Sequence, residues 1–264
     1  MCALALLALI PVALWLAQTV LLRVAGLPVQ WQLSSRALPR GLKRINRTAG
    51  YVAIAAALLA YPLVRGLPPL GYYAAFFPAG RRPVELAHGF CAALLYLSLL
   101  YLAWTVSGNV RFEIRHDARR LLRRVAAAPL AAVAIALVEE LLFRAMLLND
   151  LLVSMRPGPA LATGVFVFAA AHYTRGVKRY WTFFGHLALG TLFCVAFYCT
   201  RALWLPLGLH AAGILVLSAV RPFIRYTGPA WLVGASIFPY AGAVGIVALL
   251  ALVLNVALSY GGLP

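Results

Sequence analysis

The chain contains long stretches in which no side chain is charged. Residues 1–22 hold no charged residue, and residues 226–264 hold none over 39 positions. A helix needs about 20 apolar residues to cross the hydrocarbon core of a bilayer. The whole sequence of 264 residues is 64% apolar and 11% charged, whereas soluble domains are about 45–50% apolar and about 25% charged. These features exclude an ordinary soluble protein and predict an integral, multi-pass membrane protein.

Apolar runs recur along the chain, and the fold class that we predict is all-α, a polytopic transmembrane helix bundle of about eight spans. The segment 65–83 is rich in proline, glycine and aromatic residues and is expected to lie at the membrane interface. The tail after Arg225 is long enough for one span plus a re-entrant or interfacial piece, broken at Pro229 and Pro239. The expected spans cover 1–22, a run that ends at 64, 86–108, a run that begins near 125, 159–172, 181–200, 202–220 and part of the tail.

Basic residues are concentrated in four of the segments between apolar runs. The segments 24–50, 108–124, 173–180 and 221–229 together hold 16 Lys and Arg, and the segments on the other side hold 5. Cytoplasmic loops of membrane proteins carry such an excess. We therefore expect these four segments in the cytoplasm and both termini outside, with 108–124 forming a short amphipathic helix on the membrane surface. The loops account for the net charge of +17, and we expect no nucleic-acid partner.

Three charged side chains lie close together inside the fourth apolar run. Charges in a spanning helix cost about 2.5–3.5 kcal/mol each on insertion scales, so those present usually have a function. Glu140 and Arg144 are four residues apart, so they share a helix face and can pair. Glu139 is rotated by about 100° from Glu140 and has no local cation. Apolar surroundings favour the neutral form of a carboxyl group, which suits a residue that takes up and returns a proton near neutral pH.

Two histidines lie in comparable surroundings. His172 ends an apolar run, one turn after Phe168, and His210 lies inside the seventh run. Together with Glu139, these side chains could bind a metal ion, or they could activate water and stabilise an oxyanion. The zinc-protease motif HExxH is absent from the sequence, and so is a GxSxG-type nucleophile motif. The residues alone leave the metal and the water interpretations open.

The order of these residues resembles the CPBP family, also called Abi, of glutamic intramembrane endopeptidases. That family comprises the type II CAAX prenyl proteases and bacterial relatives linked to bacteriocin processing and immunity. The motifs that carry the resemblance are EExxxR (Glu139, Glu140, Arg144), FxxxH (Phe168, His172) and a third histidine, His210, in LWLPLGLHA after GxxxxG (Gly185, Gly190).

The resemblance extends over about a third of the chain. It divides the single membrane domain into N-terminal spans with basic loops at 1–124, a catalytic core at 125–215 and a C-terminal transmembrane tail at 216–264.

The resemblance also implies a role for each side chain. Glu139 would be the general base that activates a water together with His172, and His210 would donate a hydrogen bond to the oxyanion. Glu140, paired with Arg144, would hold Glu139 and the helix in place. The family chemistry implies neither a cofactor nor a metal.

One position departs from the family pattern. The residue four positions after the third histidine is commonly Asn or Asp, but here it is Ile214, which cannot donate a hydrogen bond. Removal of one oxyanion-hole donor costs soluble hydrolases about 10²–10³ in rate. Either the activity is weaker, or another group takes over this task, and His186 is a candidate.

The leading hypothesis is a metal-independent intramembrane endopeptidase that uses a Glu/His-activated water to cleave a membrane-anchored peptide or protein near its anchor. A prenylated, a bacteriocin-like and a sorting-signal-bearing substrate all remain open. The alternatives are a catalytically weak or inactive scaffold or immunity protein of the same fold, and a metal-dependent Glu/His membrane enzyme. Arg outnumbers Lys by 21 to 2, which is typical of GC-rich bacterial genomes, so the expected location is the bacterial cytoplasmic (inner) membrane.

Overall fold

The computed structural model of the chain describes residues 2–33, 38–80, 82–114, 117–174, 180–235 and 238–261. Helices dominate it. The helices are α1 (Cys2–Val24), α2 (Arg40–Val64), α3 (Pro69–Ala74), α4 (Arg82–Val106), α5 (Ala118–Glu140), the π-helix η1 (Leu141–Leu148), α6 (Asn149–Ser154), α7 (Pro157–Ala171), η2 (Tyr180–Thr182), α8 (Phe183–Thr200), α9 (Trp204–Val220), η3 (Arg221–Phe223), α10 (Ala230–Val233), η4 (Pro239–Ala241) and α11 (Ala243–Tyr260). The strands are β1 (Val110–Phe112) and β2 (Ile224–Tyr226). The predicted all-α, polytopic helix bundle is confirmed.

Within the described residues, seven helical stretches are long and apolar enough to cross a membrane, judged by length and composition. The longest is Leu121–Ser154, in which α5, η1 and α6 follow one another over 34 residues. The expected span at 159–172 corresponds to α7, which has only 15 residues. At 1.5 Å per residue α7 is about 22 Å long, which is shorter than the hydrocarbon core of about 30 Å. The prediction of about eight spans is therefore met by seven full-length helices and one short helix.

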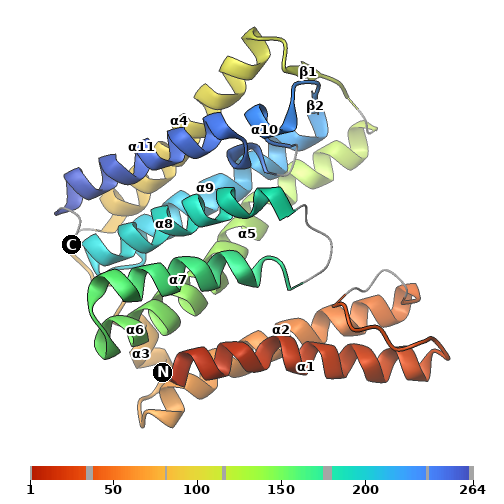
Figure 1. Cartoon of the computed structure of the whole chain (residues 1–264), viewed down its shortest axis with the longest axis vertical. Coiled ribbons are helices and arrows are strands. Elements are labelled where there is room, and N and C mark those ends of the chain that lie inside the picture. The colour runs from red at the N-terminus through yellow and green to blue at the C-terminus, as the bar shows by residue number, and fades with distance from the viewer. Residues whose placement is uncertain are drawn as a thin grey trace.

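Consecutive long helices run in alternating directions, so the two termini lie at the same end of the bundle (Figure 1). The opposite end holds the two strands, the C-terminal end of α1 and the N-terminal ends of α2 and α5 (Figure 1). Each of the four basic segments identified in the sequence begins or ends at this end of the bundle. Parts of these segments, among them residues 34–37 and 175–179, lie outside the described residues.

The segment 108–124 does not form the separate surface helix that the sequence suggested. Residues 110–112 form β1, which pairs antiparallel with β2, and the arginine-rich part is the beginning of α5. Val110 and Ile224 are buried and Arg111 and Arg225 are exposed, as the alternation along a strand leads one to expect, but Phe112 is exposed as well. Residues 115 and 116 of this segment lie outside the described residues.

Helix α9 lies inside the bundle and packs against α4, α5 and α8. It crosses α4 at two glycines. A methyl group on Gly89 would clash with the carbonyl oxygen of Leu205, and one on Gly208 would clash with that of Leu86. Small residues let two helix backbones approach closely in a membrane, where lipid offers no hydrophobic driving force for association. This crossing and the contact of α9 with α5 fix the position of His210 relative to the end of α5.

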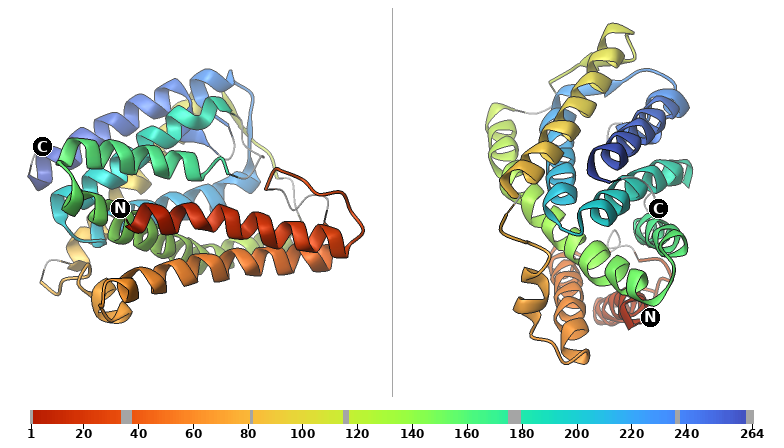
Figure 2. Two further views of the ribbon diagram at one scale, coloured as in Figure 1. Left: turned by 60° about the horizontal axis from the view of Figure 1, so that its bottom comes forward. Right: turned by 90° about the vertical axis from the view of Figure 1, so that its left-hand side faces the viewer.

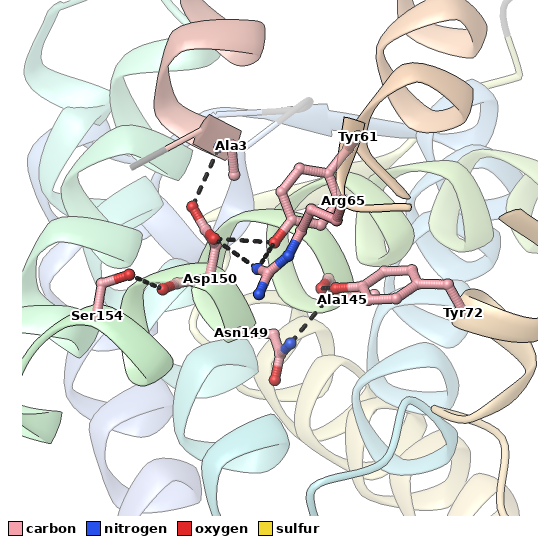
Figure 3. A network of polar contacts seen from close by, with 8 residues as sticks. All are labelled: Ala3, Tyr61, Arg65, Tyr72, Ala145, Asn149, Asp150 and Ser154. Atoms are coloured by element: carbon pink, nitrogen blue, oxygen red, sulfur yellow. Dashed lines mark hydrogen bonds and ion pairs between the residues drawn. The ribbon is translucent and has the colours of Figure 1, made fainter. Parts of the chain in front are cut away.

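Helices α1 and α2 form a hairpin at one edge of the bundle, as both views in Figure 2 show. A cluster around Asp150 of α6 connects this hairpin to the rest of the protein (Figure 3). Its carboxylate accepts hydrogen bonds from the Tyr61 hydroxyl at 2.9 Å and from the Ala3 backbone N–H at 3.1 Å, and it forms an ion pair with Arg65 at 3.0 Å. The first turn of a helix leaves N–H groups without partners and favours a nearby negative charge. The carboxylate therefore stabilises the start of α1.

Candidate active site

Glu139 and Glu140 are the last two residues of α5, immediately before the π-helix η1. A π-helix closes hydrogen bonds between residues i and i+5, and such segments are frequent at functional sites. The two carboxylates point in different directions. Glu140 is fully buried, whereas 29% of the Glu139 side chain is exposed, and Glu139 borders a cavity.

Glu140 forms a buried ion pair with Arg144, as the sequence predicted. The Nε atom of Arg144 lies 3.3 Å from Oε2 of Glu140, and both side chains are 0% exposed. The guanidinium carbon of Arg144 also lies 4.5 Å from the ring centre of Phe168 and 5.0 Å from that of Phe193. Aromatic faces attract a cation, and more strongly where water is excluded. The carboxylate and the two rings together stabilise a charge that would otherwise be costly to bury.

The second oxygen of Glu140 holds His210 of α9. The Nδ1 atom of His210 lies 2.7 Å from Oε1 of Glu140, so Nδ1 carries the hydrogen and donates to the carboxylate. The Nε2 atom on the other side of the ring then faces Glu139, at 3.7 Å from its Oε2. The His210 ring stacks on Phe193 with ring centres 4.6 Å apart.

His172, which follows α7 directly, is held in a comparable way. Its Nδ1 donates to the carbonyl oxygen of Phe168 at 2.8 Å, because a carbonyl oxygen can only accept. Its Nε2 lies 3.8 Å from Oε2 of Glu139. The structure thus brings all five predicted site residues together, and it directs the Nε2 atoms of His172 and His210 toward the same carboxylate oxygen.

The cavity at this carboxylate has a volume of about 240 Å³ and a mainly apolar lining. Helices α4, α5, α7, α8, α9 and α11 contribute to its wall. Ile214 lines it one turn after His210, as expected for two positions that share a helix face. His186, which the sequence marked as a possible donor, also lines the cavity.

Two tyrosines of the cavity wall were missed by the sequence reasoning, Tyr96 of α4 and Tyr240 of η4. Tyr96 donates to the carbonyl oxygen of Gly245 at 3.0 Å. Tyr240 comes from the irregular segment before α11, which the sequence predicted to be a re-entrant or interfacial piece. The prolines and glycines around it predicted the irregular backbone, but nothing in the pattern indicated that its tyrosine would reach His186.

The donors that a metal would use here are Glu139, His172 and His210. In the described part of the chain, however, no group of three or more His, Cys, Asp or Glu side chains is arranged so that it could hold a metal ion. Both Nε2 atoms lie at a distance from the carboxylate that a shared water molecule can span. The arrangement therefore suits acid–base chemistry on a small polar molecule inside an apolar cavity.

Comparison with known proteins finds one family model that is similar to part of this chain. No curated protein and no solved structure matches it. The family model described as type II CAAX prenyl endopeptidase Rce1-like matches residues 121–216. This range contains Glu139, Glu140, Arg144, His172 and His210. The match agrees with the resemblance that the motifs indicated: residues 121–216 are similar to the Rce1-like family, and they lie within a multi-pass membrane protein.

Proposed function

We propose that this protein is a metal-independent intramembrane endopeptidase of the glutamic type. The observation that carries the proposal is the convergence of two fixed imidazoles on one carboxylate, with Nε2–Oε2 distances of 3.7 and 3.8 Å, at the wall of an apolar cavity. The family match supports peptide-bond hydrolysis as the reaction class.

In the proposed reaction, a water molecule binds between Glu139 and His172. A water that forms hydrogen bonds to both groups bridges the 3.8 Å between Oε2 and Nε2. Its oxygen attacks the peptide carbonyl carbon while its proton passes to the Glu139 carboxylate. The carboxyl group then gives this proton to the leaving amine as the C–N bond breaks. General-base assistance of this kind contributes about 10²–10⁴ in rate.

His210 has a different part in the proposal, because its Nδ1 hydrogen is already donated to Glu140. To stabilise the oxyanion it must carry a second hydrogen on Nε2, and so act as an imidazolium.

We further propose that the substrate is a membrane-anchored peptide or protein cut near its anchor. Prenylated, bacteriocin-like and sorting-signal-bearing substrates fit this description equally. The proposed location is the bacterial cytoplasmic membrane, with the basic end of the bundle inside. This orientation rests on the excess of basic residues at that end.

The test compares wild type with Glu139→Gln, which keeps the side-chain size and removes the base. Two readouts are used: cleavage of an internally quenched peptide with a prenylated Cys-Ala-Ala-X end in liposomes, and the new peptide termini in membranes of cells that express either form. We expect cleavage by wild type, loss of at least 10²-fold in the variant, and equal amounts of both proteins in the membrane.

The same assay separates the alternatives. Wild type that cleaves nothing in either readout would support a scaffold or immunity protein of the same fold, for which Ile214 is the strongest argument. Cleavage that stops with a chelator and returns with Zn²⁺ would support a metal enzyme. Full activity of Glu139→Gln would refute the glutamic mechanism itself.

A further inference from the structure

The wall of the cavity around His210 has no side-chain donor at the next turn of α9. Ile214 lines the cavity there with a hydrocarbon side chain. In the proposed reaction the oxyanion is therefore met from α9 by His210 alone. A second donor, if the protein has one, must come from another wall.

Another part of the wall is formed by the irregular segment between α10 and α11. Two glycines let this segment lie against its neighbours. A methyl group on Gly185 of α8 would clash with the backbone of Ala241, and one on Gly245 of α11 would lie 2.7 Å from the Cα atom of Tyr240. The close contact on both sides fixes the backbone of η4, and with it the origin of the Tyr240 side chain. Tyr240 is 8% exposed and lines the same cavity as Glu139 and Ile214.

The Tyr240 hydroxyl is directed by His186 of α8. His186 is 0% exposed, and its Nδ1 lies 2.9 Å from the carbonyl oxygen of Thr182. Since a carbonyl can only accept, Nδ1 carries the hydrogen, and in the neutral ring Nε2 accepts the Tyr240 O–H at 3.3 Å. The His186 ring in turn lies 4.8 Å from the ring of His172, centre to centre. The partner of the Tyr240 hydroxyl is thus adjacent to the histidine that we propose holds the water, and all three side chains line the same cavity.

We infer that Tyr240 supplies the oxyanion donor that residue 214 cannot, with His186 as its positioning residue. The inference rests on the proposed function. In the resting protein the O–H points to Nε2 of His186 over a long hydrogen bond. An oxyanion is a stronger acceptor than a neutral imidazole, because hydrogen bonds to an ionised acceptor are about twice as strong. The O–H turns to the oxyanion as charge develops, and the proton stays on the tyrosine.

The experiment removes only the hydroxyl. Tyr240→Phe is compared with Tyr96→Phe, a matched control that makes the same change on the same cavity wall. Cleavage of the prenylated Cys-Ala-Ala-X peptide and release of membrane peptides are both measured per folded protein. We expect Tyr240→Phe to lower kcat by about 10²-fold, the effect of one lost oxyanion donor, with KM nearly unchanged. Tyr96→Phe should stay within about threefold of wild type, since its hydroxyl donates to a backbone carbonyl group.

A second variant tests whether the two positions replace each other. Ile214→Asn adds an amide donor where the family commonly has one. In the Tyr240→Phe background it should restore kcat by at least about tenfold, whereas in the wild-type background it should change kcat by less than about threefold. A purely structural role of Tyr240 would not give this rescue.

Each other outcome overturns the inference. Tyr240→Phe that cleaves like wild type, or that Ile214→Asn does not rescue, rules out the donor role. Should Tyr240→Phe fail to fold, Ile214→Asn alone decides, because a rise in kcat of tenfold or more over wild type would mean that no second donor is present. Wild type that cleaves while Glu139→Gln does not keeps the proposed function intact in all of these cases.

Discussion

Two carboxylates on the same long helical stretch, Leu121–Ser154, lie in different surroundings. Asp150 near its end is closed in by short contacts of 2.9, 3.0 and 3.1 Å to Tyr61, Arg65 and Ala3 (Figure 3). Glu139, closer to the middle, faces two imidazoles at 3.7 and 3.8 Å and borders a cavity. Both are acidic side chains on one long membrane-spanning stretch, and their surroundings differ.

The distances suit the Asp150 cluster to a structural role and Glu139 to the chemistry that we propose. Short hydrogen bonds satisfy the oxygens of Asp150 and connect three helices, which leaves this carboxylate little capacity for another partner. The separations at Glu139 are too long for direct hydrogen bonds, yet short enough for a water molecule to bridge. A carboxylate held at this spacing by rigid neighbours is prepared for a reacting molecule.

The π-helix η1 lies between Glu139 and the Asp150 cluster, and a side chain of another helix contacts its backbone. Tyr72 of α3 donates to the carbonyl oxygen of Ala145 at 2.7 Å, a contact also visible in Figure 3. The aromatic segment after α2, expected at the membrane interface, thus reaches into the bundle and contacts the helix that carries the site. Seven of the eight residues of η1 are buried. Their packing fixes the rotation about the helix axis that separates Glu139 from Asp150.

The largest effect is expected from breaking the buried ion pair of Glu140 and Arg144, next to Glu139. Glu140→Gln leaves Arg144 buried at 0% exposure without its carboxylate, which costs about 3–5 kcal/mol of unfolding free energy. Membrane abundance and the thermal midpoint in detergent should both fall. The double variant Glu140→Gln/Arg144→Met, which removes both charges, should recover most of this stability.

The double variant also separates stability from chemistry. It should remain inactive although it is folded, because His210 loses the carboxylate that orients Nδ1. An active double variant would contradict the role proposed for Glu140, and a double variant no more stable than Glu140→Gln would contradict the pairing energy.

The sequence was sufficient for those features that depend on periodicity and on the cost of buried charge. The uncharged runs predicted the spanning helices, and the spacing of Glu140 and Arg144 predicted their ion pair. That ion pair is local, four residues along one helix. The irregular segment around Pro229 and Pro239 was also predicted, because proline removes a backbone donor and interrupts a helix.

Features that depend on tertiary contacts were beyond the sequence. No residue pattern distinguishes the π-helix from an α-helix at 141–148, since the two differ by one residue per hydrogen-bonded turn. The pairing of β1 with β2 joins segments that are far apart in the chain, so a three-residue strand was taken for part of a surface helix. The positions of Tyr240 and Asp150 are set by their packing partners on other helices.

An intermediate effect is expected from a change of Asp150. In Asp150→Asn, whichever way the amide turns, its NH₂ group faces either the Ala3 N–H on one side or the Tyr61 hydroxyl and the Arg65 guanidinium on the other. A buried donor without an acceptor costs about 1–3 kcal/mol. The thermal midpoint should fall accordingly, while kcat per folded protein stays within about twofold of wild type. A fall in kcat of tenfold or more would mean that this cluster controls the site, and the contrast between the two carboxylates would fail.

The smallest effect is expected from a change of Arg65, the third partner of Asp150. Arg65 contacts Asp150 at 3.0 Å, but 38% of its side chain is exposed, so water screens the ion pair. Exposed pairs contribute about 0–1 kcal/mol, and the Tyr61 and Ala3 contacts remain when the charge is removed. Arg65→Gln should therefore lower the unfolding free energy by less than about 1 kcal/mol, and the difference should shrink further in high salt. The measurement is the thermal midpoint in detergent at two ionic strengths, with Arg65→Lys as the charge-retaining control. A loss larger than that of Asp150→Asn, or one that persists unchanged in high salt, would show that the guanidinium stabilises the hairpin by its hydrogen bonds to Tyr61 and Asp150 and not by its charge.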